Sequence, residues 1–454
     1  MTSSIRWTRR IGPSLLAAAF LVASFLAGGF YESTYSLLAA AVWLGIAIGS
    51  ALAPLRRPSL AVLALAGFAA WTLLSALWGP AGPALRVAPL AVLYAGALLA
   101  AEQVDRRLLL RLTWAACVIV ATVAFVALLA GLAPEAAGPD SDRLSWPLGY
   151  ANGLGLVAVI GVVLSFRERP RLAFAGGSIC ALAAVLTFSR TSLLAGLVGL
   201  VVAAALGGRI PQRVALGGAV LLSLTAILLA QPVAARFAAP APDEGDARRL
   251  LDVSGHGRAE LWRVAWEEGL EHPLLGAGGG TWARAYLEEQ RTTAAPANAH
   301  SLPLETFAEL GLVGVVLLAT FGFAVVRRAG GDPLAAGAVV AWAVASSADW
   351  TWQLPAATLP ALFAAAALTR SDARVGSTRG LALALCALAV GLGCALHGVG
   401  AALLEEGKGR SSATFLPFDA RPWLALEERE RACLIDPGEP AIRRADPSNE
   451  GCIP

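Results

Sequence analysis

Long apolar runs recur from one end of the chain to the other, and they constrain its fold more than any other feature. The runs are about 17–25 residues long, which is the length that a helix needs to cross a bilayer. Charged residues make up only 15% of the sequence, against roughly a quarter in an average soluble protein. The sequence therefore predicts an all-α polytopic membrane protein.

The apolar runs predict about 12–13 transmembrane helices. Candidate spans lie roughly at residues 12–30, 35–53, 60–78, 84–101, 108–132, 149–166, 172–188, 191–206, 214–231, 302–326, 334–349, 352–369 and 380–403. Two interpretations stay open for the spans at 334–349 and 352–369, because Asp349-Trp-Thr-Trp-Gln353 between them fits either a tight turn or a break in one long element. We expect four parts: transmembrane helices (1–231, about nine), a large extracytoplasmic loop with short helices (232–301), further transmembrane helices (302–403) and an extracytoplasmic tail (404–454).

The distribution of arginine predicts which side of the membrane each turn faces. The N-terminus and alternate turns together hold 18 arginines, whereas the turns on the other side hold only Arg143 and Arg190, with Arg86 at the start of a span. Turns rich in basic residues face the cytoplasm. We therefore expect a multi-pass protein of the cytoplasmic (inner) membrane whose large loop and tail lie outside.

Charge and cysteine usage limit the function classes. The net charge is only +3, which gives no indication of a nucleic-acid partner. No His, Cys, Asp or Glu cluster has the spacing of a metal site, so we predict no metal and no cofactor. Four of the six cysteines lie in apolar runs, and only Cys433 and Cys452 share one polar segment in which they could pair.

Short elements are expected in the two outer segments. Apolar residues recur at helical spacing over Gly257–Leu270, with Trp262 and Trp266 on one face, which favours a helix lying along the membrane interface. We expect a flexible turn over Leu274–Gly280, whose glycine spacing does not match a dinucleotide loop. In the tail we expect one short helix over Pro422–Leu434 and a loose end.

Polar residues gather at the outer ends of the predicted spans, where membrane proteins place functional groups. Arg190 lies between two closely joined spans, and Arg258 begins the interfacial helix. Each residue also has a structural interpretation: an arginine can extend to lipid headgroups, Tyr and Asn can join helices, and Glu305 can cap its own helix. The candidate substrate-binding residues are Arg143, Tyr150, Asn152, Ser189, Trp262, Asn298 and Glu305.

His300 is the candidate base. Ser301 is a good N-cap and Pro303 is tolerated in a first turn, so a helix should start at Leu302 with His300 just outside it. The positive end of a helix disfavours imidazolium and keeps the ring neutral, which is the form that accepts a proton. A solvated interfacial histidine is the alternative interpretation.

Several of these motifs occur together in one known family. Tyr150-Ala-Asn152, Ser189-Arg190, Gly257-Arg258-Ala-Glu-Leu-Trp262, Pro273-Leu-Leu-Gly-Ala-Gly278, Ala299-His300-Ser and Glu309-Leu-Gly-Leu-Val-Gly314 resemble the O-antigen ligase family over about residues 140–315. That family consists of bacterial membrane glycosyltransferases that use polyprenyl-diphosphate-linked glycans. The chain has a single histidine at the end of the loop, where some members have two.

The resemblance implies a metal-independent glycosyltransferase of cell-envelope polysaccharide biosynthesis. By this analogy Arg190 and Arg258 bind the diphosphate of an undecaprenyl-type donor, and His300 is the base, on the extracytoplasmic side. The acceptor stays open among a glycolipid, a growing glycan and a protein, because a ligase, a polymerase and a protein O-oligosaccharyltransferase share this architecture. A lipid or solute transporter and a non-catalytic assembly protein are the alternatives from other classes.

Overall fold

The computed structural model describes residues 11–52, 54–132, 143–208, 257–289, 296–436, 438–440 and 442. Within these ranges the chain is helical, and an isolated bridge between Arg56 and Arg374 is its one β-type pairing. The all-α class predicted from the sequence is therefore confirmed. Residues 1–10, the predicted span 214–231, the first part of the large loop and Cys452 lie outside the described residues.

Apolar helices form the body of the molecule and correspond to the other twelve predicted spans. Within the described residues six are long and apolar enough to cross a membrane, and six are shorter. In chain order they are α2 (Gly12–Phe25), α3 (Glu32–Leu52), α4 (Leu60–Leu74), α5 (Ala81–Gln103), α6 (Arg106–Leu129), α7 (Ala151–Ser165), α8 (Pro170–Leu186), α9 (Arg190–Leu206), α15 (Leu302–Val326), α16 (Pro333–Ala348), α17 (Pro355–Thr369) and α18 (Ser377–Glu405).

Local sequence signals fix where several of these helices begin. The side chain of Asp105 accepts a hydrogen bond from the backbone N–H of Leu108 at 2.9 Å and caps α6. Ser189 caps α9 in the same way, through the N–H of Ser192 at 3.2 Å. Such caps satisfy backbone donors that have no partner in the first helical turn. The capped starts agree with the spans read from the sequence.

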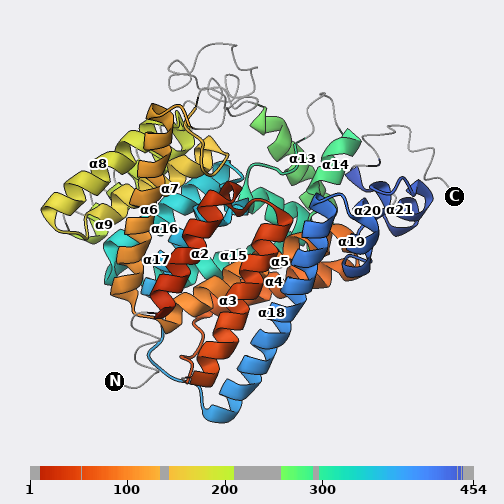
Figure 1. The fold of residues 1–454 in the computed structure, drawn as a ribbon, viewed down its shortest axis with the longest axis horizontal. Coiled ribbons are helices and arrows are strands. Elements are labelled where there is room, and N and C mark those ends of the chain that lie inside the picture. The colour runs from red at the N-terminus through yellow and green to blue at the C-terminus, as the bar shows by residue number, and fades with distance from the viewer. Residues whose placement is uncertain are drawn as a thin grey trace.

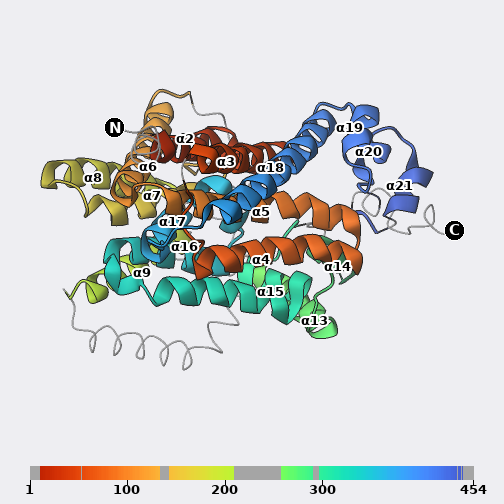
Figure 2. The same ribbon diagram turned by 90° about the horizontal axis from the view of Figure 1, so that it is seen from below.

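The centre of the bundle is made of α7 and α17. Every residue of α17 is buried, and Val162 is the one residue of α7 that is only partly so. Around them the helices pack through small residues: a Cβ atom on Gly199 of α9 would lie 2.5 Å from the carbonyl oxygen of Gly337 in α16. Close approach at glycine and alanine is how helices pack where both neighbours and lipid are apolar. Helices α3 and α18 lie side by side along the bundle in both views (Figures 1 and 2).

The short helices gather at one end of the bundle. Helices α13 (Arg258–Glu271) and α14 (Trp282–Glu289) precede α15, and α19 (Gly409–Phe415) follows α18. In Figure 1, α13 and α14 lie in the upper part of the molecule and α19 lies at its right side, all away from the far ends of α3 and α18 at the bottom. In α13, Leu261 and Ala265 are buried whereas Trp266 is 51% exposed. An exposed tryptophan fits a helix that lies along the membrane interface, and the interfacial position of α13 stays a prediction.

The tail differs from the sequence prediction of one helix over Pro422–Leu434. It forms α20 (Arg421–Leu424) and α21 (Arg429–Ile435), separated at Glu427, whose φ is +60°. A non-glycine residue in this left-handed region interrupts a right-handed helix. The prediction of a single helix is therefore wrong. Cys433 is disulfide-bonded.

The tail is also held against the bundle, so the prediction of a loose end does not apply to the part described here. Arg421 donates to Glu32 of α3 at 2.6 Å, and Arg86 of α5 donates to Glu439 at 2.8 Å. Arg421 also pairs with Asp419, and although burial raises the pKa of that carboxyl, the hydrogen bonds and charge of Arg421 hold it below its ordinary value. The partners Arg421 and Glu32, and Arg86 and Glu439, are far apart in sequence, so their pairing depended on the fold.

Candidate functional site

The turn between α16 and α17 forms the base of the site. Asp349 follows α16 in an extended conformation, with φ −157° and ψ 164°, and the short 3-10 helix Thr351–Gln353 leads into α17. The segment is thus a tight turn, one of the two interpretations left open by the sequence. The Asp349 side chain is completely buried and accepts a hydrogen bond from the N–H of Trp350 at 2.7 Å.

Three side chains from two other segments converge on Asp349. The Tyr150 hydroxyl donates to its Oδ1 at 2.6 Å, and the Asn152 amide donates to its Oδ2. Arg258, from the start of α13, donates to Oδ2 at 3.2 Å. A carboxylate only accepts hydrogen bonds and has about four lone-pair positions, so it can gather these donors. The buried carboxylate therefore fixes the orientation of Arg258.

Asn152 connects this carboxylate to a second arginine. Arg143 donates from Nη2 to the Asn152 side-chain oxygen at 2.5 Å and from Nε to the carbonyl of Thr187 at 2.8 Å. Thr187 lies at the end of α8, so Arg143 links α8 to the start of α7. Two guanidinium groups, Arg143 and Arg258, thus contact opposite ends of one Asn152–Asp349 unit.

Asn152 also contacts the start of α9. The Ser192 hydroxyl donates to the carbonyl of Asn152 at 2.9 Å, and the Ser189 hydroxyl donates to Ser192 at 2.8 Å. Arg190 is the first residue of α9 and is half-buried. The α9 start that carries Arg190 is therefore hydrogen-bonded to the residue that reaches Asp349. Ser189 acts here as a cap and a link between helices.

His300 lies just outside α15, one residue before the N-cap Ser301, as the capping pattern predicted, although the Ser301 side chain makes no cap bond. Its φ is +54°, a left-handed conformation that is uncommon for a residue with a Cβ atom and is found mainly where surrounding contacts impose it. Its Nδ1 lies 3.3 Å from the carbonyl of Asn298. A carbonyl only accepts, so this contact places the ring proton on Nδ1 and leaves the Nε2 lone pair to take a proton.

The surroundings of His300 favour its neutral form. Burial lowers the pKa of His300 below its ordinary value of 6.5. The Asp349 carboxylate acts in the opposite direction and raises the pKa, and the Arg258 guanidinium lowers it further. A neutral imidazole at neutral pH is the form that a general base requires.

The same α16–α17 turn holds the segment before His300 from its other side. Glu305 accepts from the N–H of Ala299 at 2.7 Å and from the Gln353 amide at 2.9 Å. Asn298 donates to the Gln353 side-chain oxygen at 3.3 Å. Glu305 therefore does bond the chain at the start of its own helix, and it also joins that start to α17. Asp349 and Gln353, four residues apart, contact the Arg258 side and the His300 side of one site.

The glycine turn after α13 is bound to a break in α15. Gly311 leaves the helical conformation, with φ +61° and ψ −162°. The N–H of Gly278 donates to the carbonyl of Glu309 at 2.9 Å, and the N–H of Leu312 donates to the carbonyl of Pro273 at 2.9 Å. A Cβ atom on Gly276 would lie 2.2 Å from the backbone of Glu309. The turn that we expected to be flexible is thus hydrogen-bonded to the kinked helix.

Trp262 is placed in a packing position. It lies against a small core formed by residues of α13, α14 and α15, among them Leu261, Trp282 and Ala308. This core attaches the loop helices to the bundle near His300. The contacts of Trp262 are with other residues of the protein, and its contact with substrate stays a prediction.

The structure thus brings most of the predicted site residues together. It does so through Asp349 and Gln353, two residues that the sequence interpretation did not assign to the site. Tyr150, Asn152 and Arg258 bond Asp349, and Arg143 joins them through Asn152. Asn298 and Glu305 meet through Gln353. Asp349 had a detectable signal, because it is a carboxylate between two long apolar runs, and charges in such places usually have a partner or a function.

The fold and this site define an all-α polytopic membrane protein with a polar centre at one end of its bundle, built from a loop and the helix ends around it. Comparison with known families agrees with this class: residues 175–319 match the family model described as O-antigen ligase. The match runs from α8 to most of α15 and supports an O-antigen ligase-like family. No curated protein matches the chain.

Proposed function

We propose that the protein transfers a glycan from an undecaprenyl-type lipid diphosphate to an acceptor hydroxyl at the outer face of the cytoplasmic membrane. The observation that carries this proposal is the convergence on Asp349, which accepts a hydrogen bond from Arg258 at 3.2 Å, together with the buried His300, whose pKa is lowered. The match of residues 175–319 to O-antigen ligase supports the same class of reaction.

The arginines suit the leaving group of this reaction. As the bond between sugar and diphosphate breaks, negative charge grows on the phosphate oxygens, and fixed positive groups lower the barrier. A guanidinium has five N–H donors, so Arg258 can contact Asp349 and still bind phosphate through a second edge. Arg143, linked to the same unit, and Arg190, at the nearby start of α9, supply further charge without a metal.

The proton has a defined route in this scheme. His300 Nε2 takes the proton from the acceptor hydroxyl while that oxygen forms a bond to the anomeric carbon. The bond from the anomeric carbon to the diphosphate breaks, and its electron pair leaves with the polyprenyl diphosphate. A single displacement of this kind inverts the anomeric configuration. Positioned general bases contribute about 10²–10⁴-fold to such steps.

The arginine distribution supports the outer location. The site residues come from the large loop and from the turns that hold few arginines. The opposite ends of the helices carry the arginine-rich turns, and one of these turns contains Arg167, which pairs with Asp332 at 2.6 Å. Turns rich in basic residues stay in the cytoplasm. The lipid-linked donor and the acceptor would therefore meet outside.

The test uses purified protein in nanodiscs, a labelled lipid-linked oligosaccharide, excess EDTA and a panel of glycolipid, glycan and protein acceptors. We expect transfer in EDTA, loss of transfer in His300→Ala, and a large loss in Arg190→Lys because one ammonium does not reproduce the fork of a guanidinium. The matched controls are His272→Ala, whose side chain is 52% exposed in the same loop, and Arg263→Ala, which lies with Arg258 in α13.

The outcomes separate the proposal from its alternatives. Full transfer by His300→Ala would exclude the base, and strict dependence on added metal would exclude charge neutralisation by arginine alone. Movement of an intact lipid or solute across the membrane of sealed liposomes that contain the protein, without glycan transfer, would favour a transporter.

A further inference from the structure

A second feature of the site is a cavity on the other side of Glu305. It has a volume of about 580 Å³ and lies between α3, α4, α5, α15 and α17, and residues of the tail also line it. Glu305 and Gln353 line it, and Ala297, three residues before His300, lies at its border. Binding sites for drug-sized molecules have volumes of about 300–1,000 Å³. The cavity therefore adjoins the candidate base and is large enough for one or two sugar rings.

The charged groups of the cavity differ from those around Asp349. Among the described residues, its lining has five carboxyl groups and three guanidinium groups: Glu32, Glu305, Glu309, Glu405 and Glu439, against Arg86, Arg284 and Arg421. Each of these arginines is paired with an acidic residue. The lining thus offers no surplus of positive charge. A phosphate group would therefore be poorly accommodated here. Arg143, Arg190 and Arg258, which we assign to the diphosphate, do not belong to this lining.

Other groups in the lining suit a neutral polyhydroxylated ligand. Besides its charged residues, the lining contains hydroxyl and amide side chains, among them Tyr31, Thr72 and Gln353. Such groups both donate and accept hydrogen bonds, as the hydroxyl groups of a sugar require. Aromatic rings at Tyr35 and Trp342 line the same space. Apolar and aromatic walls with a few placed polar groups are typical of sites for small organic ligands.

We propose that this cavity binds the acceptor, and that the acceptor is the end of a neutral glycan. This inference rests on the proposed function and specifies its second substrate. The diphosphate of the donor occupies the side of the arginines, and the acceptor sugar occupies the side of the carboxyl groups. One hydroxyl of that sugar reaches past Glu305 and Gln353 to Nε2 of His300.

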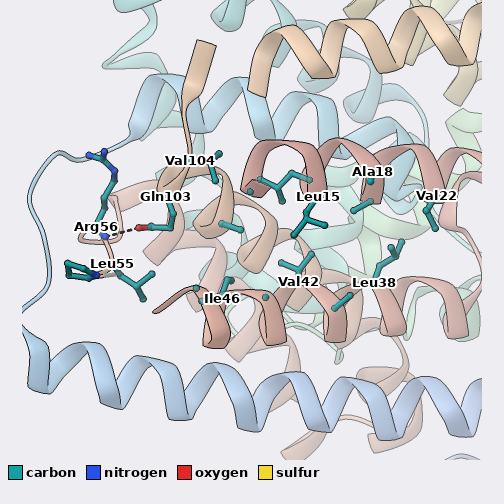
Figure 3. Close-up of a pocket in the computed structure, with 18 of the residues that line it drawn as sticks. Leu15, Ala18, Val22, Leu38, Val42, Ile46, Leu55, Arg56, Gln103 and Val104 are labelled. Carbon is teal, nitrogen blue, oxygen red and sulfur yellow. Dashed lines mark hydrogen bonds between the residues drawn. The ribbon is translucent and has the colours of Figure 1, made fainter. Parts of the chain in front are cut away.

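Helix α5 offers a matched pair of substitutions for the test. Ala91 lines the cavity, whereas Ala100 lines a separate apolar groove of about 470 Å³ between α2 and α3. Figure 3 shows that groove, with Leu15 and Val42 along it. At its end the backbone N–H of Arg56 donates a hydrogen bond of 2.6 Å to the side chain of Gln103. Both alanines are half-buried. Ala91→Phe would fill part of the cavity, and Ala100→Phe makes the same change on the same helix outside it.

The experiment measures glycan binding without donor. Full-length protein in detergent is applied to an array of defined bacterial glycans, neutral and phosphorylated, and dissociation constants for the best binders are then measured by microscale thermophoresis. We expect neutral glycans to bind, Ala91→Phe to weaken them by at least about tenfold, and Ala100→Phe to leave the constants unchanged. Binding of labelled lipid-linked donor should be the same in both variants.

Several results would overturn the inference. They are binding of no neutral glycan, preference for phosphorylated glycans, and equal glycan binding by Ala91→Phe and the wild type. Loss of donor binding in Ala91→Phe would show that the cavity holds the lipid chain of the donor instead. Failure of the proposed function is a separate result, because it shows as absence of glycan transfer from the lipid diphosphate whatever the binding array gives.

Discussion

Replacement of Asp349 by Asn tests the centre of the site with the smallest change of shape. The carboxylate is completely buried and accepts from Tyr150, Asn152, Trp350 and Arg258. An Asn side chain keeps one oxygen for the Tyr150 hydroxyl and the Trp350 N–H. Its amide nitrogen would face the Asn152 amide and Arg258, which are both donors. The substitution therefore removes two hydrogen bonds and the negative charge next to Arg258.

The size of the effect follows from these contacts. A hydrogen bond to a charged group contributes about 1.5–3 kcal/mol, so two lost bonds give about 3–6 kcal/mol. The Arg258 side chain is 18% exposed, and water at that edge recovers part of the loss. We take about 3 kcal/mol for the cost of keeping Arg258 in its present position. Because about 1.4 kcal/mol is a factor of ten, kcat/KM for transfer should fall by roughly 100-fold.

The assay is transfer of labelled glycan from the lipid-linked donor, with thermal stability followed in parallel by size-exclusion chromatography. Asp372→Asn is the matched control, because Asp372 pairs with Arg56 at 2.8 Å but its side chain is 89% exposed, and exposed ion pairs contribute little. A kcat/KM of Asp349→Asn within about threefold of the wild type would refute the reasoning. An equal loss in Asp372→Asn would show that the effect is not specific to the site.

Two further predictions concern the titration of the base and the glycine turn. Burial lowers the pKa of His300 below its ordinary 6.5, Asp349 raises it and Arg258 lowers it, so the rate should increase with pH through a pKa below 6.5. In the residual activity of the variants, the rising part of the pH–rate profile should move to lower pH in Asp349→Asn and to higher pH in Arg258→Gln. Measured pH–rate profiles test this prediction, and shifts of both variants in the same direction would contradict it. Gly276→Ala should unfold or inactivate the protein, because its Cβ would lie 2.2 Å from backbone atoms. Gly407→Ala has a similar φ of +76° but nothing within 4 Å of the added atom, so it should cost only the strain of the left-handed conformation, about 1–2 kcal/mol. Melting temperatures decide, and equal effects would contradict the proposed clash.

The sequence was sufficient to predict the long apolar helices of the bundle, because their signals are local. Apolar run length decides whether a segment crosses a bilayer, and caps such as Asp105 and Ser189 mark where helices begin. The position of His300 just before a helix followed from Ser301 and Pro303. The same local patterns indicated which polar residues lie at helix ends and are therefore available for a site.

Only the tertiary structure decided which of those residues meet. Asp349 is 199 residues from Tyr150 and 91 from Arg258, and no local pattern specifies contacts at such separations. The tail illustrates the same limit, because Arg421 and Glu32 pair across 389 residues. Packing of the small-residue faces of the helices brings these groups to one end of the bundle, and a buried carboxylate stays there only with donors gathered around it. The sequence therefore determined the helices and the supply of polar groups, and the packing determined the site.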